Sequence, residues 1–185
     1  MISVNPAVRW VAQRPPDSTG GLFQIVYLCN AAYILFKPSM FKKLTDEIRE
    51  LSLPKGSFAI FGSGPMAIRG LKEPNDIDLI VTKDVYELLK NKHGWDEKIY
   101  NESEKHYLRK GRIEAWNMWG PGNWDIPRLI ETAELIDGLP YVTLDNVLAW
   151  KRRNGRPKDA ADIEKIEKYL KDNKSKISMR QRRRL

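Results

Sequence analysis

The chain has 185 residues, of which 42% are hydrophobic and 30% charged, and its formal net charge is +8. This apolar content excludes a wholly disordered chain and is enough for one hydrophobic core. The single cysteine, Cys29, excludes a disulfide framework and a cysteine-rich zinc site. It fits a reducing compartment, so we expect a cytoplasmic protein.

The positive charge is concentrated at the ends of the chain. Residues 171–185 carry seven basic residues and one acid, and residues 1–39 have a net charge of +2, so residues 40–170 are neutral overall. We therefore expect one globular domain over 40–170, followed by a basic, disordered tail over 171–185. Contact of this tail with RNA phosphates is the alternative to a merely solvated end.

Residues 1–39 differ in composition from the rest. Residues 1–21 contain three prolines and have no helical or strand period, which predicts poor order. Residues 22–36 are apolar but number only 15, whereas a membrane-spanning helix needs about 20. We rank a short element packed on the domain first, then a non-native extension upstream of Met40, and then a membrane anchor.

Regular patterns begin near residue 40. A helix is predicted over 41–51, with Ser39 as its N-cap, because apolar residues recur at helical spacing. A buried strand over 57–61 leads through a Gly-Ser turn into a short helix over 66–69. The alternating residues 76–81 predict a second strand. The pair Asp84 and Glu87 predicts a capping box for a helix over 85–91.

The second half contains further strands and then helices. Strands are predicted over 98–101, 106–109 and 112–118, and the last two are joined by a turn at Gly111. Three helices follow: one over 127–135, one over 143–151 that ends at Gly155, and one that begins at Pro157. The order of elements predicts an α/β (α+β) domain, in which helices pack on a mixed β-sheet and the C-terminal portion is helical.

Two acids in the strand over 76–81 are candidate metal ligands. Asp76 and Asp78 are two positions apart, so their side chains lie on the same face of a strand. Adjacent carboxylates repel unless a cation neutralises them, and Mg²⁺ prefers such oxygen ligands. A simple pair of acids at a strand end, after a turn, is the alternative.

Gly62 and Ser63 form a candidate phosphate site. A strand that ends at glycine and enters a helix directs unpaired backbone N–H groups toward one point, and the serine adds a hydroxyl donor. Twelve residues separate this turn from Asp76. A phosphate site beside a pair of metal-binding acids predicts phosphoryl or nucleotidyl transfer.

The spacing resembles the signature of the nucleotidyltransferase superfamily that includes DNA polymerase beta. That signature is an aliphatic strand, Gly-Ser, about a dozen residues, and then Asp-x-Asp between aliphatic residues. The matching residues are Phe61, Gly62, Ser63, Asp76, Ile77, Asp78 and Leu79. The resemblance implies a third acid on a later strand, for which Glu114 is the candidate.

A second segment, residues 151–163, resembles the helical Lys…Arg-x-x-Asp-x-x-Asp segment of small stand-alone prokaryotic members, including abortive-infection type toxins. This resemblance implies that Lys151 contacts the nucleotide. The two acids that end the pattern, Asp159 and Asp162, are expected to cap and pair within the last helix rather than bind metal. Three tryptophans, Trp116, Trp119 and Trp124, are expected to pack in or around the core, with a stacking platform for a base as the alternative.

Taken together, these resemblances imply an enzyme that uses two Mg²⁺ ions to transfer a nucleoside monophosphate from a nucleoside triphosphate such as ATP. The acceptor is a hydroxyl of RNA, protein or a small molecule, and pyrophosphate is released. The alternative is a catalytically degenerate member that acts as a toxin–antitoxin partner or an RNA-binding module.

Overall fold

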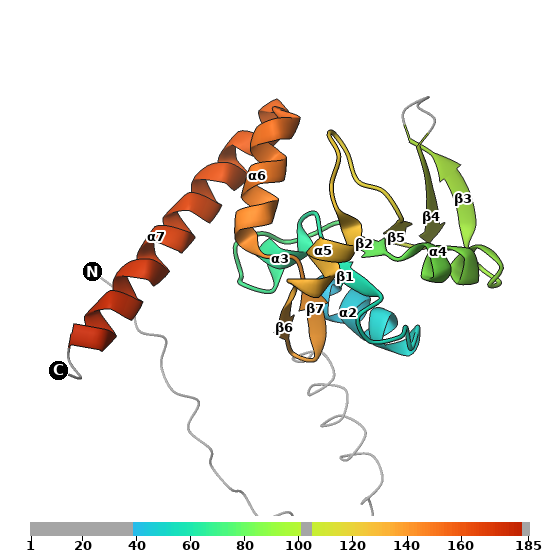
Figure 1. Ribbon diagram of the computed structural model, residues 1–185, viewed down its shortest axis with the longest axis horizontal. Helices are drawn as coiled ribbons and strands as arrows, with labels where there is room; N and C mark the ends of the chain where they lie inside the picture. The colour runs from blue at the N-terminus through green and yellow to red at the C-terminus, as the bar shows by residue number, and fades with distance from the viewer. Residues whose placement is uncertain (1–38, 101–104, 183–185) are drawn as a thin grey trace, which may run out of the picture. The chain divides into compact units, whose positions relative to one another are not determined.

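The computed structural model describes residues 39–100 and 105–182. Within them seven strands form one mixed sheet in the order β3-β4-β5-β2-β1-β7-β6 (Figure 1). Strand β2 pairs in parallel with β5, β1 pairs in parallel with β7, and the other neighbours are antiparallel. The strands are β1 (Phe58–Ile60), β2 (Ile77–Val81), β3 (Asp96–Ile99), β4 (His106–Lys110), β5 (Ile113–Trp116), β6 (Glu134–Ile136) and β7 (Leu139–Tyr141).

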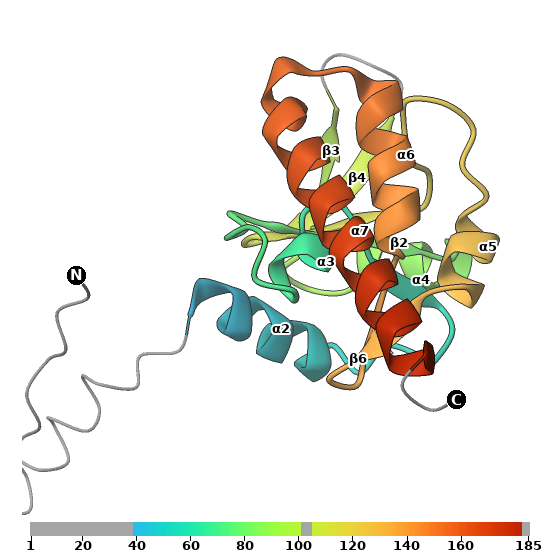
Figure 2. The ribbon, with the colours of Figure 1, turned by 90° about the vertical axis from the view of Figure 1, so that its left-hand side faces the viewer.

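Helices cover both faces of this sheet. One core lies beneath α2 and α4, and the other lies between the sheet and α3, α5, α6 and α7. Helices α6 and α7 lie side by side (Figures 1 and 2). The helices are α2 (Met40–Glu50), α3 (Gly64–Ala67), α4 (Lys83–Lys90), α5 (Ile126–Glu131), α6 (Leu144–Asn154) and α7 (Ala160–Arg182), with a 3₁₀ turn η1 (Pro157–Asp159) before α7.

Alternation along β2 separates the two cores. Ile77, Leu79 and Val81 point into the first core and Ile80 into the second. Asp78 therefore shares the α6–α7 face of the sheet with Ile80, because alternate residues of a strand lie on one face. The expectation of a mixed sheet with helices packed on it is confirmed.

Several helix boundaries are those that the sequence predicted. The Ser39 hydroxyl accepts a hydrogen bond from the backbone N–H of Lys42, which caps α2. The Thr143 hydroxyl caps α6, and that helix ends at Gly155, whose φ is +62°. Helix α4 differs, because its N-cap is Thr82 rather than the pair Asp84 and Glu87.

The structure corrects the sequence prediction in one further place. The helix predicted over 127–135 ends at Glu131, and the hairpin β6–β7 follows it. Asp137 and Gly138 form the tight turn of this hairpin, both with positive φ. Helix α7 extends to Arg182, past residue 171, where the predicted tail begins. After Pro157 the chain contains no glycine or proline that would end a helix.

The predictions for residues 1–38 lie outside the described residues, including the apolar segment 22–36. No helix in the described part of the chain combines the length and the apolar character that crossing a membrane requires.

Candidate functional site

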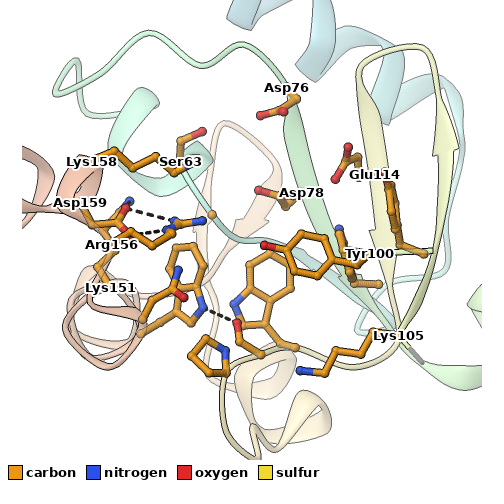
Figure 3. Close-up of a pocket in the computed structure, with 18 of the residues that line it drawn as sticks. Ser63, Asp76, Asp78, Tyr100, Lys105, Glu114, Lys151, Arg156, Lys158 and Asp159 are labelled. Atoms are coloured by element: carbon orange, nitrogen blue, oxygen red, sulfur yellow. Dashed lines mark hydrogen bonds and ion pairs between the residues drawn. The ribbon is translucent and has the colours of Figure 1, made fainter. Parts of the chain in front are cut away.

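A pocket of about 710 Å³ lies between the sheet and the helical C-terminal portion (Figure 3). One side is formed by β2, β5 and the turn after β1, and the other by α6, η1 and the loop between them. All six residues that the sequence singled out as site residues line this pocket: Gly62, Ser63, Asp76, Asp78, Glu114 and Lys151.

The register of the two parallel strands aligns two of the acids. Asp78 of β2 is the direct partner of Glu114 of β5. Asp76 comes immediately before β2 and two positions before Asp78, so it belongs to the same face. Figure 3 shows all three carboxyl groups around the same open space. The fold thus brings together acids that are 36 residues apart in sequence (78 and 114).

The turn after β1 packs directly against Asp78. The Phe61 backbone N–H donates to the Asp78 carbonyl at 2.8 Å, and Gly62 has a φ of +57°. A Cβ on Gly62 would lie 2.0 Å from Asp78 Oδ2, so only glycine allows this approach. The Ser63 hydroxyl makes no capping hydrogen bond to α3, and Ser63 lines the pocket.

Gly62→Ala is expected to destabilise the fold by about 3 kcal/mol, because the new methyl group adds a clash with Asp78 to the unfavourable positive φ. Gly56→Ala is the matched control. Gly56 has a φ of +76°, but its Cβ would meet nothing within 4 Å, so we expect a loss of only about 1 kcal/mol. Urea unfolding measures both, and equal losses would contradict the contact between Gly62 and Asp78.

The electrostatics of the acid group show an excess of negative charge. Removal of Asp78 from water, followed by repulsion from Asp76 and then from Glu114, raises the pKa of the Asp78 carboxyl to about 7. Trp116 and Arg156 lower the pKa of Asp78, but not enough to cancel this rise. Burial and then the charge of Asp76 also raise the pKa of Glu114, although Arg109 Nη1 lies 3.8 Å from Glu114 Oε1.

This shift predicts how stability depends on pH. The folded-state pKa of Asp78 is above its unfolded value of 3.8, so the folded state holds more protons between about pH 4 and pH 7. In chelator-treated protein, the free energy of unfolding should therefore fall by about 1–4 kcal/mol across this range, relative to Asp78→Asn. Urea unfolding of both proteins at several pH values measures the difference, and parallel pH profiles would contradict the shift.

Asp76, Asp78 and Glu114 offer carboxylate oxygens whose negative charge is not compensated. Such ligands fit a hard divalent cation. In residues 39–100 and 105–182, however, no three His, Cys, Asp or Glu side chains are already gathered closely enough to hold one metal ion. The carboxyl groups would have to move closer together around an ion. Without a bound ion, the raised pKa of Asp78 means that its carboxyl group is partly protonated near neutral pH.

Five of the residues that line the pocket are cationic. Across from the three acids lie residues of the C-terminal portion, among which Figure 3 labels Lys151, Arg156 and Lys158. Further lysines in the lining are Lys72 and Lys105. A cavity with acids on one wall and cations on another suits a ligand that carries both phosphate groups and a bound metal ion.

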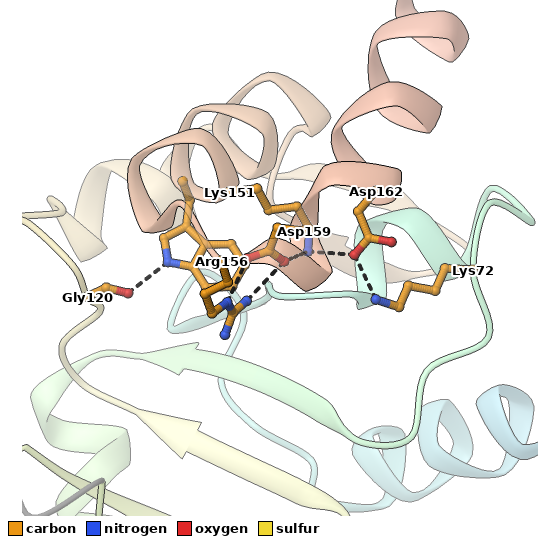
Figure 4. Close-up of polar contacts among 7 residues, drawn as sticks. Lys72, Gly120, Lys151, Arg156, Asp159 and Asp162 are labelled. Atoms are coloured by element: carbon orange, nitrogen blue, oxygen red, sulfur yellow. Dashed lines mark hydrogen bonds and ion pairs between the residues drawn. The ribbon is translucent and has the colours of Figure 1, made fainter.

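Lys151 belongs to a buried network of charges between α6 and α7 (Figure 4). Only 2% of this residue is exposed, and Nζ donates to Asp159 Oδ1 at 2.9 Å and to Asp162 Oδ2 at 2.8 Å. Asp159 also binds Arg156, and Asp162 also binds Lys72. The acids thus pair with cations, but these partners lie on α6 and in the loops rather than within the last helix, where pairing was expected.

The tryptophans pack as the sequence analysis expects. Trp116 and Trp119 are buried in the second core, and the Trp119 ring lies 4.7 Å from that of Phe61. The Trp116 ring stacks on the Tyr107 ring, with 4.4 Å between the two ring centres. Both tryptophans also contribute to the pocket lining.

The sequence assigned no role to several polar residues of the lining, among them Tyr100, Lys105, Arg156 and Lys158. Arg156 and Lys158 fall within the segment 151–163, so their position in that pattern was the available signal. Tyr100 and Lys105 flank residues 101–104, and no spacing in the sequence distinguishes them. Comparison of the chain with protein-family models, curated proteins and solved structures finds no match.

Proposed function

We propose that this protein is a Mg²⁺-dependent nucleotidyltransferase with a core like that of the superfamily that includes DNA polymerase beta. The observation that carries the proposal is the direct pairing of Asp78 with Glu114 on parallel strands, with Gly62 packed against Asp78. Asp76 adds a third carboxylate, and the facing wall offers cations to phosphate groups.

In this proposal Asp76, Asp78 and Glu114 would hold two Mg²⁺ ions, which would neutralise the carboxylates and the developing charge on the phosphate oxygens. Gly62 and Ser63 bind the triphosphate through the backbone and the hydroxyl. The acceptor hydroxyl oxygen forms a bond to the α-phosphorus, and the bond from that phosphorus to the pyrophosphate oxygen breaks. Glu114 accepts the hydroxyl proton.

A non-catalytic nucleotide-binding or RNA-binding protein is the second candidate. It is favoured by the absence, among the described residues, of three acidic or other ligating side chains already gathered as a metal site. Such a protein would bind the nucleotide in the same pocket but leave it intact.

The test is incubation of the purified chain with Mg²⁺ and each α-³²P-labelled nucleoside triphosphate in turn. Total RNA, cell protein and a panel of small hydroxyl compounds serve as acceptors. Transfer of label that chelator abolishes supports the enzyme. Binding of nucleotide without transfer to any acceptor supports the second candidate.

A further inference from the structure

Arg156 is held rigidly at the edge of the pocket. Its Nε donates to Asp159 Oδ2 at 2.6 Å and its Nη2 to Asp159 Oδ1 at 3.1 Å, so one edge of the guanidinium is fully used. The guanidinium also lies 5.1 Å from the centre of the Trp150 ring. These contacts fix the position of the Arg156 guanidinium more tightly than that of a surface arginine, because they combine a two-point ion pair with a cation–π contact.

The remaining edge of the guanidinium faces the acids. Within the described residues no hydrogen bond uses Arg156 Nη1, and about a third of the side chain (31%) is exposed. Figure 3 shows Arg156 between Asp159 on one side and Asp78 on the other. A phosphate oxygen placed between the acids and Arg156 would therefore meet a pre-oriented N–H donor.

Lys151 offers no such donor. Its side chain is 3% exposed, and its ammonium is shared between Asp159 and Asp162. To reach a phosphate it would have to leave two buried carboxylates, which is costly in a site closed to water. Its contact with Asp159 instead fixes the carboxylate that holds Arg156.

We propose that Arg156, rather than Lys151, binds the phosphate groups of the substrate, and that Asp159 and Lys151 are positioning residues for it. This inference rests on the proposed function for the identity of the ligand, a nucleoside triphosphate. It assigns the Arg-x-x-Asp part of the segment 151–163 a binding role that the buried lysine does not fill.

The first test measures binding of inorganic tripolyphosphate by calorimetry, which requires neither a known base nor a known acceptor. Arg156→Ala is expected to weaken binding at least tenfold, and Arg156→Lys to recover part of the loss, because the charge returns without the fork of donors. The matched control is Arg152→Ala. Arg152 is exposed on α6, pairs with Glu167 and does not line the pocket, so binding should be unchanged.

The second test separates positioning from simple charge. Asp159→Asn removes a negative charge from the pocket wall, which by itself should strengthen binding of an anion. If Asp159 positions Arg156, binding weakens instead, by about threefold or more. The double variant Arg156→Ala/Asp159→Asn should then bind no more weakly than Arg156→Ala alone, because the two residues act through one contact.

The outcomes distinguish this inference from the proposed function. Wild-type binding that depends on Arg156, without any nucleotide transfer, supports the inference and contradicts the enzyme. Transfer by the wild type together with undiminished binding by Arg156→Ala and Arg156→Lys overturns the inference and leaves the enzyme. A wild-type chain that does not bind tripolyphosphate also overturns it. Circular dichroism and thermal melting confirm that each variant is folded.

Discussion

Asp78→Asn is expected to lower the rate of nucleotide transfer by about a thousandfold or more while the fold is retained. Asparagine has nearly the same shape, but it lacks the negative charge that strengthens binding of a divalent cation. Loss of several kcal/mol of transition-state stabilisation corresponds to a rate change of this size. The measurement is transfer of label from the α-phosphate under saturating Mg²⁺ and nucleotide.

The stability of the same variant supplies an independent check. Asp78 is repelled by Asp76 and Glu114 in the metal-free protein, so its neutral replacement should leave the free energy of unfolding at neutral pH unchanged or higher. Asp96→Asn is the control, because Asp96 is an exposed acid on β3 away from the pocket. It should retain activity. Full activity in folded Asp78→Asn would reject the assignment of Asp78 as a metal ligand.

Much of the fold was predictable because local signals determine it. The hydroxyl caps at Ser39 and Thr143 and the glycine at 155 mark helix ends through contacts within a few residues. The strands β6 and β7 were missed because each has three residues, and β7 contains Pro140. Their signal was the Asp137–Gly138 turn, which is typical of a two-residue hairpin.

The candidate site was predictable only where its residues follow a local pattern. Asp76 and Asp78 share a face because of strand geometry alone, so the sequence sufficed to pair them. Glu114 could be suggested but not placed, since its register against Asp78 is a property of the assembled sheet. The buried state of Lys151 could not be predicted, because the pairing with Asp162 depends on how α7 packs on α6.

Lys151→Met is expected to destabilise the protein by about 3 kcal/mol, the lower part of the range for breaking a buried ion pair. Removal of the ammonium leaves Asp159 and Asp162 buried, at 2% and 4% exposure, with Arg156 and Lys72 as their remaining partners. Those partners limit the loss. Urea unfolding at pH 7 measures it.

The pH dependence of this loss tests its cause. Burial opposes ionisation of both aspartates, but hydrogen bonds from Arg156 and Lys151 lower the pKa of Asp159, and those from Lys151 and Lys72 lower that of Asp162. Stability from these contacts is therefore present above the unfolded pKa of about 4 and lost as the pH falls below it. The difference in free energy of unfolding between wild type and Lys151→Met should therefore shrink in acid. The exposed control, Arg152→Met, should lower the free energy of unfolding by less than about 1 kcal/mol at every pH. A Lys151→Met protein as stable as the wild type but unable to bind tripolyphosphate would instead make Lys151 a phosphate ligand.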